Sequence, residues 1–253
     1  MEGSQLASSR MTTSAKDKLI VALDVHTTQR AIQLVNLLRD YVGMFKVGSQ
    51  LFTSSGPDVV RQVVSSGCKV FLDLKFHDIP NTVALAAVES VRLRVSILNV
   101  HALGGREMMQ RTADAVSEVS AREGLQRPSV IAVTVLTSSD SKTLSEVGID
   151  STPDLQVQRL SLLAEESGMD GVVTSPREIT LVRRVVTRQN FLVVTPGVRP
   201  TGTALDDQKR VMTPAEAVAA GADYLVVGRP VTGAKDPVIA ASGVVKEIES
   251  ALR

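Results

Sequence analysis

Short runs of apolar, often β-branched residues alternate with longer stretches of helical periodicity along most of the chain. This alternation is typical of repeated strand and helix units around a parallel sheet. We expect eight strands, at residues 18–24, 44–48, 69–75, 96–101, 129–136, 171–174, 191–195 and 224–227. Eight such units in a chain of 253 residues predict a single α/β domain folded as a (β/α)8 TIM barrel, rather than an open doubly wound sheet.

Two helix starts in the second half of the chain carry the same capping signal. Ser175-Pro176-Arg177-Glu178 and Thr213-Pro214-Ala215-Glu216 each place a hydroxyl residue before a proline, with a glutamate three residues after the cap. This pattern predicts a capping box with proline in the first helical position. Each box separates two expected strands and therefore supports the count of eight units.

The amino-acid composition limits the kinds of partner that the protein is expected to bind. The chain has 28 basic and 27 acidic residues, a formal net charge of +1, so it has no general attraction for nucleic acid or an anionic membrane. No apolar run approaches the ~20 residues that span a bilayer. The single cysteine, Cys68, excludes an intrachain disulfide and indicates a reducing compartment, so we expect a cytoplasmic protein with a small-molecule partner.

Residues 1–17 differ from the rest of the chain. They are rich in Ser and Thr and lack the apolar core of a signal peptide, so we expect a disordered tail before a barrel domain at 18–253. A shortage of acidic residues leaves a weak transit-peptide interpretation open, although Glu2 and the lack of an amphipathic pattern argue against it.

Polar residues gather where the expected strands end, which is where barrels of this kind carry their chemistry. Residues two apart in a strand share a face, so Asp73 and Lys75 lie on one side of the third strand and Leu72, Leu74 and Phe76 on the other. Other strand ends also contribute polar residues: Asp24, Lys46, Asn99, His101, Thr137 and Ser138. Each charge alone is equally well explained by a salt bridge at the rim, but four charges from three adjacent strands favour a site.

Further expectations concern three charged residues, Lys46, Lys75 and Asp78. Lys46 lies between apolar neighbours, and burial of an isolated charge is costly, so we expect it to pair with Asp24 or Asp73. A lysine between two acids stays protonated, so Lys75 suits a general acid better than an amine nucleophile. Asp78 follows the third strand in a loop, and it faces either its own barrel or a neighbour's.

The loops after the last two strands resemble an anion site. The segment 196–212 is longer than the ~2–6 residues usual for such a connection and contains Gly197, Arg199 and Gln208, which suggests a lid over a bound group. Gly228 and Arg229 follow the eighth strand, a place where such barrels often bind phosphate. Arg229 can add a bidentate contact.

A metal centre is not predicted. The three histidines, His26, His77 and His101, have spacings that match no standard zinc pattern. In a barrel mouth such side chains are more often hydrogen-bonding partners than metal ligands.

Residues 73–82, Asp-Leu-Lys-Phe-His-Asp-Ile-Pro-Asn-Thr, resemble the active-site motif of the orotidine 5'-phosphate decarboxylase family. Further blocks resemble its bacterial branch in the same order and at compatible spacings: 21–24, 45–48, 99–102, 195–200, 207–210 and 224–230. The resemblance implies decarboxylation of orotidine 5'-phosphate to UMP in pyrimidine synthesis, without a metal or organic cofactor.

The resemblance also implies roles for individual residues. Lys75 would protonate C6 of the pyrimidine and Asp73 would lie beside the departing carboxylate, while Asp24 and Lys46 would hold ribose hydroxyls. Asp78 and Thr82 would reach the site from a second subunit, so the expected form is a homodimer. The remaining roles concern the base and the phosphate: Thr137 at the pyrimidine, Gln208 between base and phosphate, and Arg199, Gly228 and Arg229 at the phosphate.

Two other interpretations remain. The first is a Mg²⁺-dependent sugar-phosphate decarboxylase or aldolase of the same suprafamily, in which an acid would be expected where this chain has Lys46. The second is a phosphate-binding barrel without catalytic activity, which the intact set of Asp73, Lys75 and Asp78 argues against.

Overall fold

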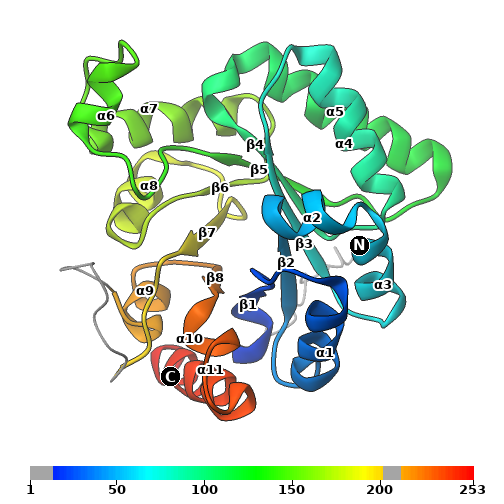
Figure 1. The fold of residues 1–253 in the computed structure, drawn as a ribbon. Helices are drawn as coiled ribbons and strands as arrows, with labels where there is room; N and C mark the ends of the chain where they lie inside the picture. The colour runs from blue at the N-terminus through cyan, green and yellow to red at the C-terminus, as the bar shows by residue number, and fades with distance from the viewer. Residues whose placement is uncertain (1–13, 202–211) are drawn as a thin grey trace, which may run out of the picture.

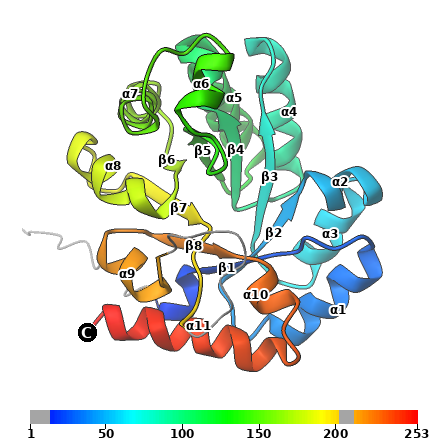
Figure 2. The same cartoon turned by 60° about the vertical axis from the view of Figure 1, so that its left-hand side comes forward.

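The computed structural model describes residues 14–201 and 212–253. Eight parallel strands form a closed barrel in sequence order, because β8 pairs back with β1 (Figures 1 and 2). The predicted (β/α)8 barrel is confirmed. The strands are β1 (Leu19–Ala22), β2 (Met44–Gly48), β3 (Val70–Phe76), β4 (Ile97–His101), β5 (Ser129–Val133), β6 (Gly171–Val173), β7 (Leu192–Pro196) and β8 (Tyr224–Val227).

Helices surround the barrel, with α11, drawn red in Figure 2, lying next to α1, drawn blue. The α-helices are α1 (Thr28–Leu38), α2 (Ser49–Ser55), α3 (Asp58–Ser65), α4 (Pro80–Arg92), α5 (Gly105–Glu123), α6 (Ser141–Glu146), α7 (Pro153–Glu166), α8 (Ile179–Val185), α9 (Pro214–Ala219), α10 (Arg229–Thr232) and α11 (Pro237–Ala251). Three short 3-10 helices are η1 (Ala15–Lys18), η2 (Ala102–Gly104) and η3 (Pro176–Glu178). No helix in the described ranges is long and apolar enough to cross a membrane.

The predicted capping residues do cap their helices. Before α9, Glu216 N–H donates to Thr213 Oγ1 at 3.2 Å, and Thr213 N–H donates to Glu216 Oε2 at 2.8 Å. Before η3, Ser175 N–H donates to Glu178 Oε2 at 3.0 Å. These contacts satisfy backbone donors that a helix start otherwise leaves free.

Regular structure is already present on the N-terminal side of the expected domain boundary at residue 18. Ala15–Lys18 forms η1, in which Ala15 is buried and Ser14 N–H donates to Asp17 Oδ2 at 3.1 Å. A Cβ added to Gly43 would lie 2.5 Å from Asp17 Cα, so η1 packs directly against the turn before β2. Residues 14–17 therefore belong to the barrel, because burial and capping hold them; residues 1–13 lie outside the described part.

The inside of the barrel changes from apolar to polar along the strands. Its centre is filled by one buried side chain from most strands: Ile20, Met44, Phe71, Ile97, Ile131, Val194 and Val226. Because inward positions recur every second residue, the next inward residue of β2 is Lys46, that of β3 is Asp73 and that of β4 is Asn99. The polar residues therefore collect at the carboxyl ends of the strands, above an apolar floor.

Candidate active site

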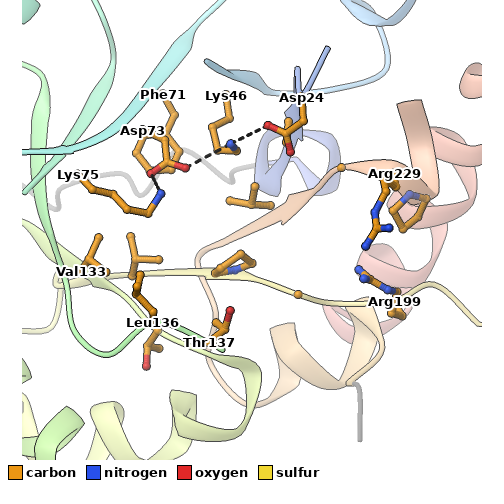
Figure 3. Close-up of a pocket in the computed structure, with 18 of the residues that line it drawn as sticks. Asp24, Lys46, Phe71, Asp73, Lys75, Val133, Leu136, Thr137, Arg199 and Arg229 are labelled. Carbon is orange, nitrogen blue, oxygen red and sulfur yellow. Dashed lines mark hydrogen bonds and ion pairs between the residues drawn. The ribbon is translucent and has the colours of Figure 1, made fainter. Parts of the chain in front are cut away.

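The carboxyl ends of the strands surround a cavity of about 340 Å³, a volume typical of small-molecule sites (Figure 3). Its lining includes eight of the residues that the sequence predicted: Asp24, Lys46, Asp73, Lys75, Thr137, Arg199, Gly228 and Arg229. The strand arrangement therefore brings these residues to one cavity, although they are spread over most of the sequence.

Charges alternate along one side of the cavity. Lys46 Nζ lies 3.2 Å from Asp24 Oδ1 and 3.2 Å from Asp73 Oδ2, and Lys75 Nζ lies 2.6 Å from Asp73 Oδ1 (Figure 3). Lys46 and Asp73 are each only 9% exposed, so the cost of removing their charges from water is offset by these charge-assisted contacts. The expected pairing of Lys46 is confirmed, and it involves both acids rather than one.

The backbone at Lys75 departs from a regular strand. The pairing of β3 with β4 shifts register between Leu72 and Phe76, and Lys75 has φ 53°. A residue other than glycine in this left-handed region costs about 1–3 kcal/mol and persists only where the surroundings hold it. The outward side of β3 nevertheless follows the predicted alternation, because Leu72, Leu74 and Phe76 all pack against the outer hydrophobic core.

Two arginines lie at the other end of the cavity. Arg199 follows β7 and Arg229 begins α10, and in Figure 3 their guanidinium groups point toward each other. Among the described residues, neither forms an ion pair. Two facing guanidinium groups with no ion-pair partner in the described part of the chain favour a bound anion, and the guanidinium fork matches the geometry of a phosphate.

Two residues with predicted roles, Asp78 and Thr82, do not line this cavity. Asp78 and Thr82 border a separate depression of about 320 Å³, which Lys75 and His77 also line. Asp78 Oδ1 accepts a hydrogen bond from Ile79 N–H at 2.6 Å. Gln208 lies outside the described residues.

Sequence reasoning missed several residues that line the cavity. Phe71 lies below Asp73 on the inward side of β3, and the period of two could have identified it. Thr174 is almost fully buried at the end of β6, where its hydroxyl donates to Glu178 Oε2 at 2.7 Å. Leu136 and Pro230 carry no polar signal, so only the three-dimensional structure places them here.

Two of the three histidines lie beside the site. The ring centroids of His77 and His101 are 5.5 Å apart, and His101 Nδ1 is buried without a hydrogen-bond partner among the described residues. Burial, with the neighbouring charges of His77 and Lys75, lowers the pKa of His101. His26 instead contacts Gln50 through Nδ1 at 2.9 Å. Within the described ranges, no group of three or more His, Cys, Asp or Glu residues is arranged to hold a metal ion.

Residues 17–244 match the model of the orotidine 5'-phosphate decarboxylase / HUMPS family. The chain is 54% identical over 242 residues to the orotidine 5'-phosphate decarboxylase of Syntrophotalea carbinolica, covering 96% of this chain and 99% of that protein. It is 56% identical over 236 residues to that of Moorella thermoacetica, covering 93% of each. The solved structure of orotidine 5'-phosphate decarboxylase from Lactobacillus acidophilus matches with a TM-score of 0.80 and 37% identity, covering 91% of this chain and 98% of that one.

Proposed function

The chain belongs to the orotidine 5'-phosphate decarboxylase / HUMPS family, and we propose that it converts orotidine 5'-phosphate to UMP and CO2 in pyrimidine synthesis, with Lys75 protonating C6. The observation that carries this proposal is the distribution of charge in the cavity. The row of Lys46, Asp73 and Lys75 lies at one end and two facing arginines lie at the other. A substrate with a phosphate at one end and a reacting carboxylate at the other matches this distribution.

The proposed chemistry is a decarboxylation followed by a proton transfer. The bond between C6 and the carboxylate breaks, CO2 leaves, and the electron pair remains on C6. The Lys75 ammonium, fixed 2.6 Å from Asp73, stabilises this negative charge as it forms and then donates its proton to C6. The neutral amine of Lys75 regains a proton from solvent, so the scheme requires no metal and no organic cofactor.

The other residues of the cavity bind and orient the substrate in this scheme. Asp73 lies beside the departing carboxylate and fixes Lys75, while Asp24 and Lys46 hold ribose hydroxyls. Thr137 contacts the pyrimidine and Gln208 bridges the base and the phosphate. Arg199, Gly228 and Arg229 receive the phosphate. Contacts far from C6 supply binding energy that positions the reacting group.

We also propose that the active form is a cytoplasmic homodimer in which Asp78 and Thr82 complete the site of the other subunit. The support is their position: neither lines the main cavity of its own barrel, yet both border a depression that reaches Lys75. Ile79, which follows Asp78, and Leu85, three residues after Thr82 in α4, are 67% and 58% exposed, as expected for apolar side chains that a partner covers.

A Mg²⁺-dependent reaction on a sugar phosphate is the nearest rival. The position of Lys46 argues against it, because its ammonium already lies 3.2 Å from both Asp24 and Asp73. A divalent cation held by these two carboxylates would have to displace it. Activity that depends on added Mg²⁺ and disappears with a chelator would favour the rival.

The central experiment follows the ultraviolet absorbance of orotidine 5'-phosphate with purified protein and a chelator present. We expect turnover in the parent and loss of turnover in Lys75→Ala. Lys142→Ala is the matched control, because the Lys142 side chain is 85% exposed and its nearest acid lies 3.9 Å away. No turnover in the parent would overturn the function, and undiminished turnover in Lys75→Ala would overturn the role of Lys75.

The shared site is tested by mixing two inactive variants, Lys75→Ala and Asp78→Ala, under conditions that exchange subunits. A mixed dimer has one site that combines an intact Lys75 with an intact Asp78 from the other chain. Activity should then return to about a quarter of the parental value, because half of the dimers are mixed and each has one working site. If Asp78 acts within its own chain, mixing restores nothing.

A further inference from the structure

The strand pair β3 and β4 is irregular where it carries the proposed proton donor. Leu72 pairs with Leu98 and Phe76 pairs with Val100, so β3 advances four residues while β4 advances two. The extra residues of β3 form a bulge, which leaves backbone groups without their regular partners across the sheet. Lys75 lies in this bulge with φ 53°.

Asn99 is the residue of β4 that faces this bulge, and its side chain takes the place of the missing ladder contact. Lys75 N–H donates to Asn99 Oδ1 at 2.9 Å, and Asn99 Nδ2 donates to Asp73 Oδ1 at 2.7 Å. Asn99 is 0% exposed. The orientation of its amide is fixed chemically, because a backbone N–H only donates and an ionised carboxylate only accepts.

We propose that Asn99 is a positioning residue for the reaction, acting through the bulge that aims Lys75 and through the carboxylate that Lys75 contacts. The inference rests on the proposed function. Asn99 does not line the cavity, so it acts on the substrate only through Asp73 and Lys75. The buried hydrogen bond to Lys75 N–H compensates for the strained backbone, and the bond to Asp73 fixes which carboxylate oxygen the ammonium meets.

This role predicts a particular kinetic signature for Asn99→Ala. We expect kcat to fall about 100-fold, the effect of displacing a reacting group by about 1 Å. KM should change little, because the arginines at the far end of the cavity remain in place. Thr112→Val is the matched control: Thr112 is also 0% exposed and its hydroxyl donates to Met108 O at 2.7 Å, but it lies in α5. This control should lose stability without losing kcat.

Asn99→Asp separates positioning from a merely structural role. A protonated carboxyl group can reproduce both contacts of the amide, accepting from Lys75 N–H and donating to Asp73. An ionised one repels Asp73, and two carboxyl groups at hydrogen-bond distance resist ionising together. The kcat of Asn99→Asp, relative to the parent at the same pH, should therefore rise as the pH is lowered. A residue that only fills space gives no such recovery.

A second measurement does not depend on activity. Exchange of the Lys75 backbone amide hydrogen with solvent should be faster in Asn99→Ala than in the parent and unchanged in Thr112→Val. Parental kcat in folded Asn99→Ala, or a pH profile of Asn99→Asp that parallels the parent, would overturn the role of Asn99 while leaving the proposed function intact. If the parent itself does not turn over orotidine 5'-phosphate, the proposed function fails instead.

Discussion

The ammonium group of Lys75 lies 2.6 Å from Asp73 Oδ1, and the two residues are neighbours on the inward side of one strand. The contact fixes a positive charge where the proposed reaction develops a negative one. Asp73 is also bonded to Lys46 and Asn99, so its carboxylate connects two ammonium groups and one buried amide.

We expect Asp73→Asn to lower kcat by roughly 10²- to 10⁴-fold, the range for loss of general acid catalysis, because Lys75, the proposed proton donor, is no longer held in place. The amide keeps the shape of Asp73, but it removes the charge that holds the two ammonium groups in place. Steady-state kinetics with orotidine 5'-phosphate measure the effect. Asp58→Asn is the control, because Asp58 forms an exposed ion pair with Arg61; an equal loss in both variants would contradict the prediction.

Replacing Lys46 should lower the stability of the protein as well as its activity. Lys46→Met leaves the buried Asp73 without one of its cations, so the free energy of unfolding should fall by about 3 kcal/mol, as when one member of a buried ion pair is removed. Urea denaturation measures this loss. Arg61→Met, in an exposed pair, should lower the free energy of unfolding by less than about 1 kcal/mol. Equal losses in the two variants would show that the buried ion pairs of Lys46 stabilise the protein no more than an exposed pair does.

Much of this site follows from the period of two along each strand. Phe71 and Asp73 on β3, and Met44 and Lys46 on β2, alternate with outward apolar residues, so the sequence predicts which side chains enter the barrel. The order of the strands then brings the polar ends together. Helix starts that carry a capping box could likewise be predicted from the sequence.

Other features depend on contacts between segments and left no local signal. The left-handed backbone of Lys75 arises from the pairing of β3 with β4, which a single strand does not encode. Asn99 was predicted to lie near the cavity, but its two bonds to β3 required the register of the sheet. The packing of Ala15–Lys18 on the barrel likewise depends on a distant glycine, Gly43.

Arg229→Ala should weaken substrate binding more than it slows the chemical step. We expect KM to rise roughly 10- to 100-fold, since a hydrogen bond to a charged group is worth about 1.5–3 kcal/mol. Orotidine, which lacks the phosphate, is the matched substrate, and the parent and the variant should process it with equal kcat/KM. A loss of the same size with both substrates would show that Arg229 does not act on the phosphate.

The half-buried His101 should make stability depend on pH. Burial and the charges of His77 and Lys75 lower the pKa of His101 below its ordinary 6.5. The charge of Asp73 acts in the opposite direction but does not outweigh them. In the window just below pH 6.5 the unfolded chain therefore binds more protons than the folded protein, so stability decreases as the pH falls through that window. The urea midpoint of the parent should drop between pH 7 and pH 5, and His101→Gln should show a smaller drop. His26→Gln, at a more exposed histidine bonded to Gln50, should keep the parental drop. Identical drops in the parent and His101→Gln would contradict the assignment.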